Sequence, residues 1–290
     1  MKPPFPSATP TWHNDTYVAI SPQRPELSAA GKTIIIIGAG SGIGRETARA
    51  FATAGATHVA LLGRTEASLN ETRSQLTLVS NSTSTSIHLV DTTQEMALQN
   101  AAASIGVWEV LVLAAGYVAE PGPMTQANTE DWWKSFETNL KGPFLALKSF
   151  VPTANSSHAA VLSLTSGMTA APAKSFPRLS AYMTSKFAHA KMMEFLPLDQ
   201  PHIFAATVHP GMVETAIFTK AGGVASNRPM DKVQLPAHFM VWLSSPEATC
   251  LNGRSVWANW DVEELKGQAD AIQSGQLMTG GTYGWPFPYM

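Results

Sequence analysis

The sequence predicts a single-domain α/β protein built on a doubly wound parallel sheet, and three observations support this prediction. Apolar, β-branched segments alternate with helical segments along most of the chain. The first apolar segment, residues 33–37, runs directly into a glycine-rich turn and then into a helical segment. The 290 residues are 44% hydrophobic, which is enough to bury one sizeable core. Strands that alternate with helices in this way form parallel sheets with helices on both faces.

Six segments of the chain are predicted to be strands of this sheet. They are residues 33–37, 58–62, 87–90, 110–113, 160–164 and 203–208. Each is a short apolar run, and helical segments separate them. The serine- and threonine-rich residues 80–86 are predicted to form a turn. In a sheet of this kind the ligand binds beyond the carboxyl ends of the strands.

The regions on either side of the alternating pattern differ from it in composition. We expect an N-terminal proline-rich arm at residues 1–29, the main domain at residues 30–262, and a C-terminal helix with an aromatic tail at residues 263–290. The arm lacks helical or strand periodicity, so it either wraps the surface or stays loose. The aromatic residues of 283–289 have three possible roles: closing a pocket, reaching a partner subunit, or covering core surface.

Charge and cysteine content exclude several functional classes. The net charge is −2, so no basic surplus is present to attract nucleic acid. Cys250 is the only cysteine, which excludes an intrachain disulfide and a cysteine-based zinc site; we expect no metal. No apolar stretch approaches the roughly 20 residues that span a bilayer, and residues 1–10 lack a secretory apolar core. We therefore expect a cytoplasmic protein without a membrane segment.

The glycine-rich turn has the sequence GAGSGIG at residues 38–44. It follows a predicted strand and precedes a predicted helix, as a dinucleotide-binding fingerprint does. Glycines at these positions let the backbone approach a pyrophosphate at the helix N-terminus. We expect cofactor contacts from Gly38, Ser41, Gly42, Ile43 and Gly44. The alternative is that the glycines only permit a tight turn.

Tyr182 and Lys186 are four residues apart and would lie on one face of a helix. An ammonium group near a phenol favours the phenolate and lowers the pKa of the tyrosine toward neutrality. Tyr182 could then transfer a proton. Taken alone, the same spacing also fits an ordinary solvated pair on a helix surface.

With three further motifs, the chain resembles the short-chain dehydrogenase/reductase family over about residues 30–260. In order, the motifs are the glycine turn, Asn139 in ETNLKG, Ser166 in LTSG, the Tyr182/Lys186 pair, and PGMVET at residues 210–215. The segments around Trp132-Trp133 and Trp257–Asp261 are most similar to fungal members. The resemblance implies a Rossmann fold and a catalytic set of Asn139, Ser166, Tyr182 and Lys186.

The resemblance also implies the role of each catalytic residue. A hydride passes between a nicotinamide and a carbonyl or secondary alcohol, while Tyr182 transfers the proton and Ser166 hydrogen-bonds the same oxygen. Lys186 would lower the pKa of Tyr182 and bind the nicotinamide ribose, and Asn139 would hold a water that links Lys186 to solvent. Ser166 and Tyr182 are 16 positions apart, longer than is typical of the family. Thr169 or Ser163 therefore remain alternatives for the hydroxyl.

NADP(H) is the cofactor that the residues after the second predicted strand favour. Gly63 stands where NAD-dependent relatives carry an aspartate, and Arg64 resembles the residue that pairs with a 2′-phosphate. The alternative is that Arg64 is only solvated. Asp91 resembles the family's adenine contact, or it caps a helix near Gln94.

Other cofactor contacts follow from the resemblance alone. They are Ala115, Gly116, Pro210, Gly211, Val213 and Thr215. The chain departs from the family at Ile37, usually a threonine, and at Leu113-Ala114, usually two asparagines, so two stabilising hydrogen bonds are lost. The single histidines His189 and His209 are predicted to be packing residues.

Residues 216–235 lie where the family has its mobile substrate lid. Phe218 and Met230 in this segment favour a mostly apolar alcohol or ketone, such as a secondary metabolite. Two other functions remain open: a non-redox enzyme (isomerase, dehydratase or cyclase) or a cofactor-sensing binding protein. We expect a homodimer or homotetramer, because the helix that carries Tyr182 and the one before it are apolar on more than one face.

Overall fold

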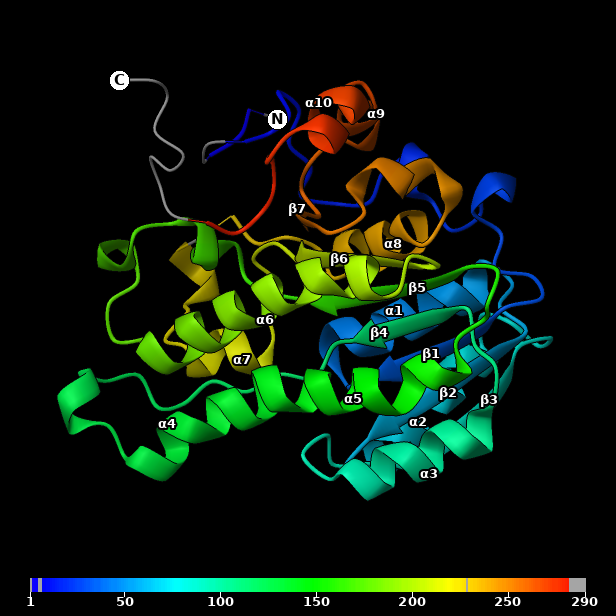
Figure 1. Ribbon diagram of the computed structural model, residues 1–290, viewed down its shortest axis with the longest axis horizontal. Helices are drawn as coiled ribbons and strands as arrows, with labels where there is room; N and C mark the ends of the chain where they lie inside the picture. The colour runs from blue at the N-terminus through cyan, green and yellow to red at the C-terminus, as the bar shows by residue number, and fades with distance from the viewer. Residues whose placement is uncertain (1, 5–6, 228, 282–290) are drawn as a thin grey trace.

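A computed structural model describes residues 2–4, 7–227 and 229–281 of the chain. Its centre is a seven-stranded sheet with strand order β3-β2-β1-β4-β5-β6-β7. All neighbouring strands are parallel, and helices cover both faces of the sheet (Figure 1). The predicted doubly wound parallel sheet is therefore confirmed.

The six predicted strands are all present, with small shifts at their ends. The strands are β1 (Thr33–Ile37), β2 (His58–Gly63), β3 (Ser84–Leu89), β4 (Val110–Leu113), β5 (Ala159–Leu164), β6 (Ile203–His209) and β7 (Arg254–Trp257). The turn predicted at residues 80–86 is wrong for its last three residues, which belong to β3. The ring of His58 on β2 hydrogen-bonds the hydroxyls of Ser84 and Ser86, so these polar residues have partners in the sheet. The short edge strand β7 was not predicted.

The sheet is buried on both faces, which explains the unbroken isoleucine run of β1. Successive side chains of a strand point to opposite faces. Ile34 and Ile36 therefore enter one core cluster and Ile35 and Ile37 the other. A parallel strand covered on both sides needs apolar residues at every position.

Two groups of helices form the outer layers. The first core contains α1 (Gly42–Thr53), α2 (Glu66–Thr77) and α8 (Gln234–Leu243); the second contains α3 (Glu95–Ile105), α5 (Gly142–Phe150) and α6 (Ser180–Asp199). Helix α4 (Thr129–Phe136) continues into α5 in one line (Figure 1). The short helices α7 (Ala216–Lys220), α9 (Val262–Lys266) and α10 (Ala269–Ser274) follow β6 and β7 in the chain.

The N-terminal segment wraps the molecule where the structure describes it. Trp12 is 4% exposed, forms a β-bridge with Trp260 and packs edge-on against Trp257 at 5.8 Å between ring centroids. Two 3-10 helices follow, Val18–Ile20 and Pro25–Leu27. Figure 1 shows this segment, in blue, beside α9 and α10. Of the two alternatives for the arm, the structure supports wrapping.

The C-terminal segment covers the free edge of β7. Ser255 N donates to Met278 O at 2.8 Å, and Gly280 N donates to Glu194 Oε1 at 2.6 Å. An exposed strand edge is a site for unwanted pairing, and this contact removes it. The aromatic tail at residues 283–289 lies outside the described residues. Among the described residues no helix is long and apolar enough to cross a membrane, and no group of potential metal ligands is found.

Candidate active site

The predicted site residues gather at the carboxyl ends of the central strands. The glycine turn follows β1, Gly116 follows β4, Ser166 follows β5 and Pro210 follows β6. Tyr182 and Lys186 lie on α6, which packs against β6. The edge at which α/β sheets bind their ligands therefore holds these motifs.

At two of its glycines, Gly38 and Gly44, the glycine turn leaves no room for a side chain. Gly38 has a φ of +93°, and a Cβ there would lie 2.6 Å from Ala115 N. A Cβ on Gly44 would lie 2.2 Å from Gly38 O. At Gly42, φ is +52° and a Cβ would lie 3.5 Å from Thr215 Cγ2. The turn therefore touches the segments after β4 and β6, and its bare backbone forms a cradle that fits a pyrophosphate.

Ser166, Tyr182, Lys186 and Asn139 lie close together and are all buried. Their exposed fractions are 5%, 8%, 3% and 0%. The side chains of Ser166 and Tyr182 share a hydrogen bond. A Cβ on Gly116 would lie 3.6 Å from Asn139 Oδ1 and 3.8 Å from Lys186 Nζ, so Gly116 borders both side chains.

Burial controls the pKa of both titratable groups. It raises the pKa of Tyr182 to about 12, and the hydrogen bond from Ser166 only partly opposes this. It lowers the pKa of Lys186 to about 8. The Lys186 ammonium donates to Leu164 O at 2.7 Å. Loss of hydration thus sets the direction of both shifts, and the role of Lys186 in lowering the pKa of Tyr182 stays a prediction.

Asn139 lies in a π-helical turn, Glu137–Lys141, between α4 and α5. Such turns often occur at functional sites. Its Oδ1 accepts from Tyr117 N at 2.8 Å, and its Nδ2 donates to Tyr117 O at 2.8 Å and to Ser185 Oγ at 3.0 Å. Asn139 thus ties the loop after β4 to α6. Its role in holding a water stays a prediction.

Arg64 and Asp91 lie at the ends of β2 and β3. Arg64 is exposed, and its charge helps to lower the pKa of Asp91, after the larger effect of the hydrogen bond from Thr93 N. Asp91 Oδ1 accepts from Thr93 N at 2.9 Å and from Thr93 Oγ1 at 2.8 Å. This carboxylate stabilises the turn before α3, whose N-cap residue is Gln94. Asp91 therefore does not cap α3 itself: its hydrogen bonds stabilise the turn that precedes the helix.

The surroundings of Gly63 and Arg45 bear on the role of Arg64. A Cβ on Gly63 would lie 3.2 Å from Leu69 Cδ2, so a longer side chain there would require Leu69 to move. Arg45, the other arginine near the turn, pairs with both oxygens of Glu71 at 2.6 and 2.9 Å. Arg45 is thus engaged elsewhere, whereas Arg64 faces solvent.

The segment 210–215 connects the glycine turn to the predicted lid. Gly211 has a φ of +83°, and Val213 is 6% exposed. Thr215 caps α7 by accepting from Phe218 N at 3.2 Å. Ile217 Cδ1 of α7 lies 3.1 Å from the position of a Gly116 Cβ, so the segment predicted to be a lid packs against Gly116.

Sequence reasoning missed three residues of this region: Asp231, Tyr117 and Lys220. Asp231 accepts from Met212 N at 2.6 Å, and Tyr117 hydrogen-bonds Asp131. Lys220 on α7 lies 4.3 Å from the centre of the Tyr117 ring, a cation–π contact between lid and loop. No motif marks these residues, because the partners come from distant parts of the chain.

The alternative hydroxyls and the two histidines have other partners. Ser163 Oγ pairs with His189 Nε2 at 2.9 Å, and Thr169 Oγ1 donates to Ser166 O at 2.6 Å. Ser166 is therefore the hydroxyl that meets Tyr182. Burial lowers the pKa of His189 well below its usual value and that of His209 to about 3, so both rings are neutral packing groups, as predicted.

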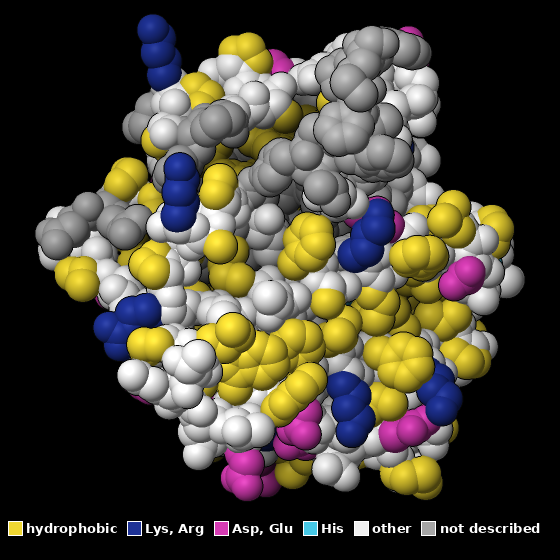
Figure 2. Space-filling model, turned by 60° about the vertical axis from the view of Figure 1, so that its left-hand side comes forward, with side chains coloured by type: hydrophobic (Ala, Val, Ile, Leu, Met, Phe, Trp, Pro, Cys, Tyr) yellow, Lys and Arg dark blue, Asp and Glu magenta, His cyan; other side chains and the backbone are white. Residues whose placement is uncertain are grey.

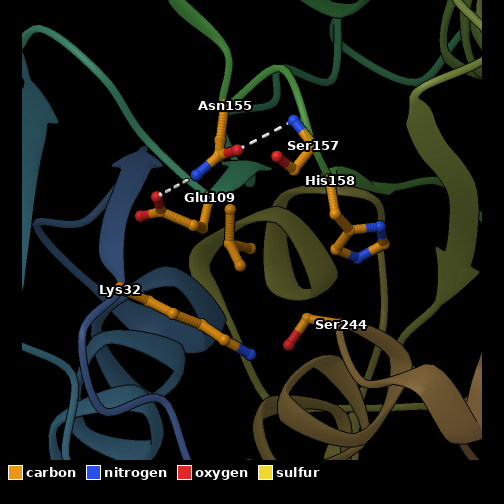
Figure 3. Close-up of a pocket in the computed structure, with 7 residues that line it drawn as sticks. Lys32, Glu109, Asn155, Ser157, His158 and Ser244 are labelled. Atoms are coloured by element: carbon orange, nitrogen blue, oxygen red, sulfur yellow. Dashed lines mark hydrogen bonds between the residues drawn. The ribbon is translucent and has the colours of Figure 1, made fainter.

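A separate cavity of about 210 Å³ lies at the opposite edge of the sheet (Figure 3). It is lined by Lys32, Glu109, Val110, Asn155, Ser157, His158 and Ser244, which lie before or at the start of β1, β4 and β5 or follow α8. Glu109 accepts from Thr33 N at 2.7 Å and from Asn155 Nδ2 at 2.8 Å. Glu109 and Asn155 thus bond each other, and none of the predicted motifs reaches this edge.

A dinucleotide cradle beside a buried serine–tyrosine pair defines the class of protein: an α/β oxidoreductase that uses a nicotinamide cofactor. Residues 32–223 match the short chain dehydrogenase family, and the chain belongs to that family. It is therefore an enzyme of the short-chain dehydrogenase/reductase type that acts on a small molecule.

Similar proteins include several from fungi. Short chain dehydrogenase pigC of Monascus ruber is 31% identical over 93% of this chain and 92% of its own length. A short chain dehydrogenase/reductase of Claviceps purpurea is 31% identical over 96% and 94%. A solved short chain dehydrogenase structure from Pseudomonas syringae is 27% identical, covers 81% of this chain and 97% of its own, and has a TM-score of 0.73. A Shigella flexneri structure complexed with NADP, at 24% identity, 81% and 99% coverage and a TM-score of 0.72, shares the fold.

Proposed function

We propose that the protein transfers a hydride between NADP(H) and the carbonyl or secondary alcohol of a mostly apolar small molecule, such as a secondary metabolite. The observation that carries the proposal is the hydrogen bond between the buried hydroxyls of Ser166 and Tyr182, beside Lys186 and Gly116. The similarity to fungal short chain dehydrogenases supports the choice of substrate class.

The residues of the chain divide the chemistry among them. A bound nicotinamide supplies or accepts the hydride. In reduction, Tyr182 donates its phenolic proton to the oxygen that gains the charge, and Ser166 donates a hydrogen bond to the same oxygen. The raised pKa of Tyr182 keeps this phenol protonated at neutral pH, which is the form that donates the proton in reduction. Lys186 would bind the nicotinamide ribose, with Asn139 near Lys186 in the wall of the site.

The remaining predicted residues would bind the rest of the cofactor. Ser41, Ile43 and the glycines of residues 38–44 would receive the pyrophosphate, and Asp91, Ala115 and Gly116 the adenosine half. Pro210, Gly211, Val213 and Thr215 would contact the carboxamide. The exposed Arg64, with Gly63 in place of an acid, supports a 2′-phosphate and hence NADP(H).

The absorbance of the reduced nicotinamide tests the proposal directly. The purified protein is mixed with NADPH or NADH and a panel of apolar ketones, and with the oxidised cofactors and the matching alcohols. Substrate-dependent loss of NADPH is the expected result. Conversion of a substrate without any absorbance change would identify a non-redox enzyme. Cofactor binding without conversion of any substrate would identify a binding protein.

We propose that the protein forms a homodimer or homotetramer through α4, α5 and α6. Trp133, Phe144, Phe187 and Phe195 on these helices are 54%, 52%, 41% and 55% exposed. Figure 2 shows hydrophobic side chains gathered on the side of the molecule where α4 and α6 begin. Apolar patches of this kind mark association surfaces. Light scattering with NADPH present should return a multiple of 31.0 kDa, and the monomer mass would refute the proposal.

We further propose the division into an arm (residues 1–29), a Rossmann-fold domain (30–262) and a C-terminal helix with its tail (263–290). The free Cys250 agrees with a reducing compartment, and we propose the cytoplasm as the location. Limited proteolysis and cell fractionation test these two points. Cleavage within residues 30–262 before the ends, or recovery in a secreted fraction, would contradict them.

A further inference from the structure

The carboxylate of Asp231 joins segments that lie far apart in the sequence. Asp231 is 7% exposed and lies just before α8, where the predicted lid returns to the core. Its Oδ2 accepts from Met212 N at 2.6 Å, and its own N donates to Met212 O at 2.9 Å. The lid segment leaves the core after Met212. These two hydrogen bonds therefore fasten its two ends together.

Gly211 lets the carboxylate approach this turn closely. A Cβ on Gly211, whose φ is +83°, would lie 2.3 Å from Asp231 Oδ2. The Asp231 carboxylate thus lies directly against the backbone of the segment 210–215. The proposed function assigns the nicotinamide end of the cofactor to that segment.

The N-terminal arm holds the other oxygen of the carboxylate. Asn14 Nδ2 donates to Asp231 Oδ1 at 2.5 Å, and Lys232 N donates to Asn14 O at 2.9 Å. On the other side, Asn259 Nδ2 donates to His13 O at 2.8 Å and His13 N donates to Asn259 O at 2.9 Å. Residues 13 and 14 of the arm therefore bond both the segment that carries Asp231 and the segment that carries Asn259.

The hydrogen bonds to the Asp231 carboxylate come from uncharged amide groups. Burial raises the pKa of this carboxyl group, and hydrogen bonds from Asn14, Met212 and Asn259 lower it. A carboxylate only accepts hydrogen bonds, so it can bridge the N–H of the cofactor segment and the amide of the arm at once. Loss of one donor would leave a buried charged oxygen unsatisfied and favour its movement toward water.

We propose that Asp231 is a positioning residue for the nicotinamide end of the cofactor site, and that the arm belongs to this site through Asn14. The inference rests on the proposed function. The adenosine end is built by the glycine turn and Arg64, and none of the Asp231 contacts reaches it. Release of the arm should therefore weaken binding of the nicotinamide half and spare the adenosine half.

Two ligands separate this role from a general loss of structure. NADPH reports on the whole site, and 2′-phospho-ADP-ribose, which lacks only the nicotinamide ring, reports on every contact except those of the ring. For Asn14→Ala in the full chain, we expect the Kd of NADPH to rise about tenfold to a hundredfold. We expect the Kd of the fragment to change less than about twofold, since its contacts are untouched.

A matched control and a rescue complete the design. Thr11→Val removes a different hydrogen bond of the arm, from Thr11 Oγ1 to Glu264 Oε1 at 2.6 Å, and should leave both Kd values unchanged. Asn14→Asp would place two carboxylates together and weaken NADPH binding at least as much as Asn14→Ala. Adding Asp231→Asn to Asn14→Asp restores one carboxylate and one amide, and should recover much of the lost affinity.

Two results would overturn the inference: an equal loss of affinity for NADPH and for the fragment, or wild-type NADPH binding by both Asn14 variants. Melting temperatures identify any variant that fails to fold, and the rescued double variant then decides the question. A wild-type protein that binds no dinucleotide would overturn the proposed function as well. Normal turnover by the Asn14 variants at wild-type Kd would overturn this inference alone.

Discussion

The adenosine and nicotinamide halves of the proposed cofactor site are built in opposite ways. The adenosine half is built on backbone without side chains at Gly38 and Gly44, and its proposed charged contact, Arg64, is exposed. The nicotinamide half consists of buried polar side chains, among them Tyr182 and Lys186. The adenosine half requires empty space next to the backbone. The properties of the nicotinamide half depend on which parts of the fold surround each polar group.

This difference predicts where substitutions have their largest effects. Buried groups lose hydration, so the pKa of Tyr182 rises to about 12 and that of Lys186 falls to about 8. Exposed charges such as Arg64 are screened by water and salt. Substitutions on the nicotinamide side should therefore have larger effects on activity and stability than substitutions on the adenosine side.

Tyr182→Phe should have the largest effect, because it removes the proposed proton donor and keeps the ring. We expect kcat to fall by about 10²–10⁴-fold, with the Kd of NADPH changed less than about threefold. Stopped-flow and steady-state assays measure both. Tyr17→Phe, which removes a hydroxyl bonded to Trp260 O at 3.2 Å, is the matched control and should retain kcat. Retention of more than about a tenth of kcat by Tyr182→Phe would remove the residue from this role.

Lys186→Met should change the pH dependence of stability. The folded pKa of Lys186, about 8, lies below the ordinary lysine value of 10.5, so the unfolded chain binds more protons between these values. Wild-type stability should therefore gain a contribution, on the order of 3 kcal/mol, as pH rises through this window, and the variant should lack it. Urea unfolding from pH 7 to pH 10 measures the difference. Parallel curves for the two proteins would show that Lys186 is not desolvated.

Gly44→Ala tests the space requirement on the adenosine side. The new Cβ would lie 2.2 Å from Gly38 O, so the turn must shift. We expect a loss of about 1–3 kcal/mol in stability, together with weaker binding of NADPH and of 2′-phospho-ADP-ribose. Gly122→Ala, where a Cβ would meet nothing within 4 Å, is the control. Unchanged binding of both ligands by Gly44→Ala would place the pyrophosphate elsewhere.

Arg64→Ala should have the smallest effect and should act on one cofactor only. Loss of a charge-assisted phosphate contact at an exposed site should raise the KM of NADPH about tenfold and leave that of NADH nearly unchanged. Arg73→Ala, another exposed arginine, which bonds Asn70 Oδ1 at 2.7 Å, is the control. Equal weakening of both cofactors, or a wild-type preference for NADH, would contradict the phosphate role.

Local patterns explain why most of the fold could be predicted from the sequence. The isoleucine run of β1 needs burial on both faces, and the glycines after it adopt backbone angles that other residues rarely adopt, such as the φ of +93° at Gly38. Each signal lies within a few neighbouring residues. The strand at residues 84–86 and the edge strand β7 escaped because their polar residues find partners only in the assembled sheet.

In the candidate site, too, some features follow from local sequence and others only from the assembled fold. The sequence by itself determined which residues lie at the carboxyl ends of the strands, because a parallel sheet places all of those ends on one edge. Only the tertiary structure decided their electrostatics: burial in the packed fold raises the pKa of Tyr182. It also decided that Asn14 and Asp231, 217 positions apart, share a hydrogen bond. Hydration loss and long-range contacts depend on the whole fold, and no short stretch of sequence specifies them.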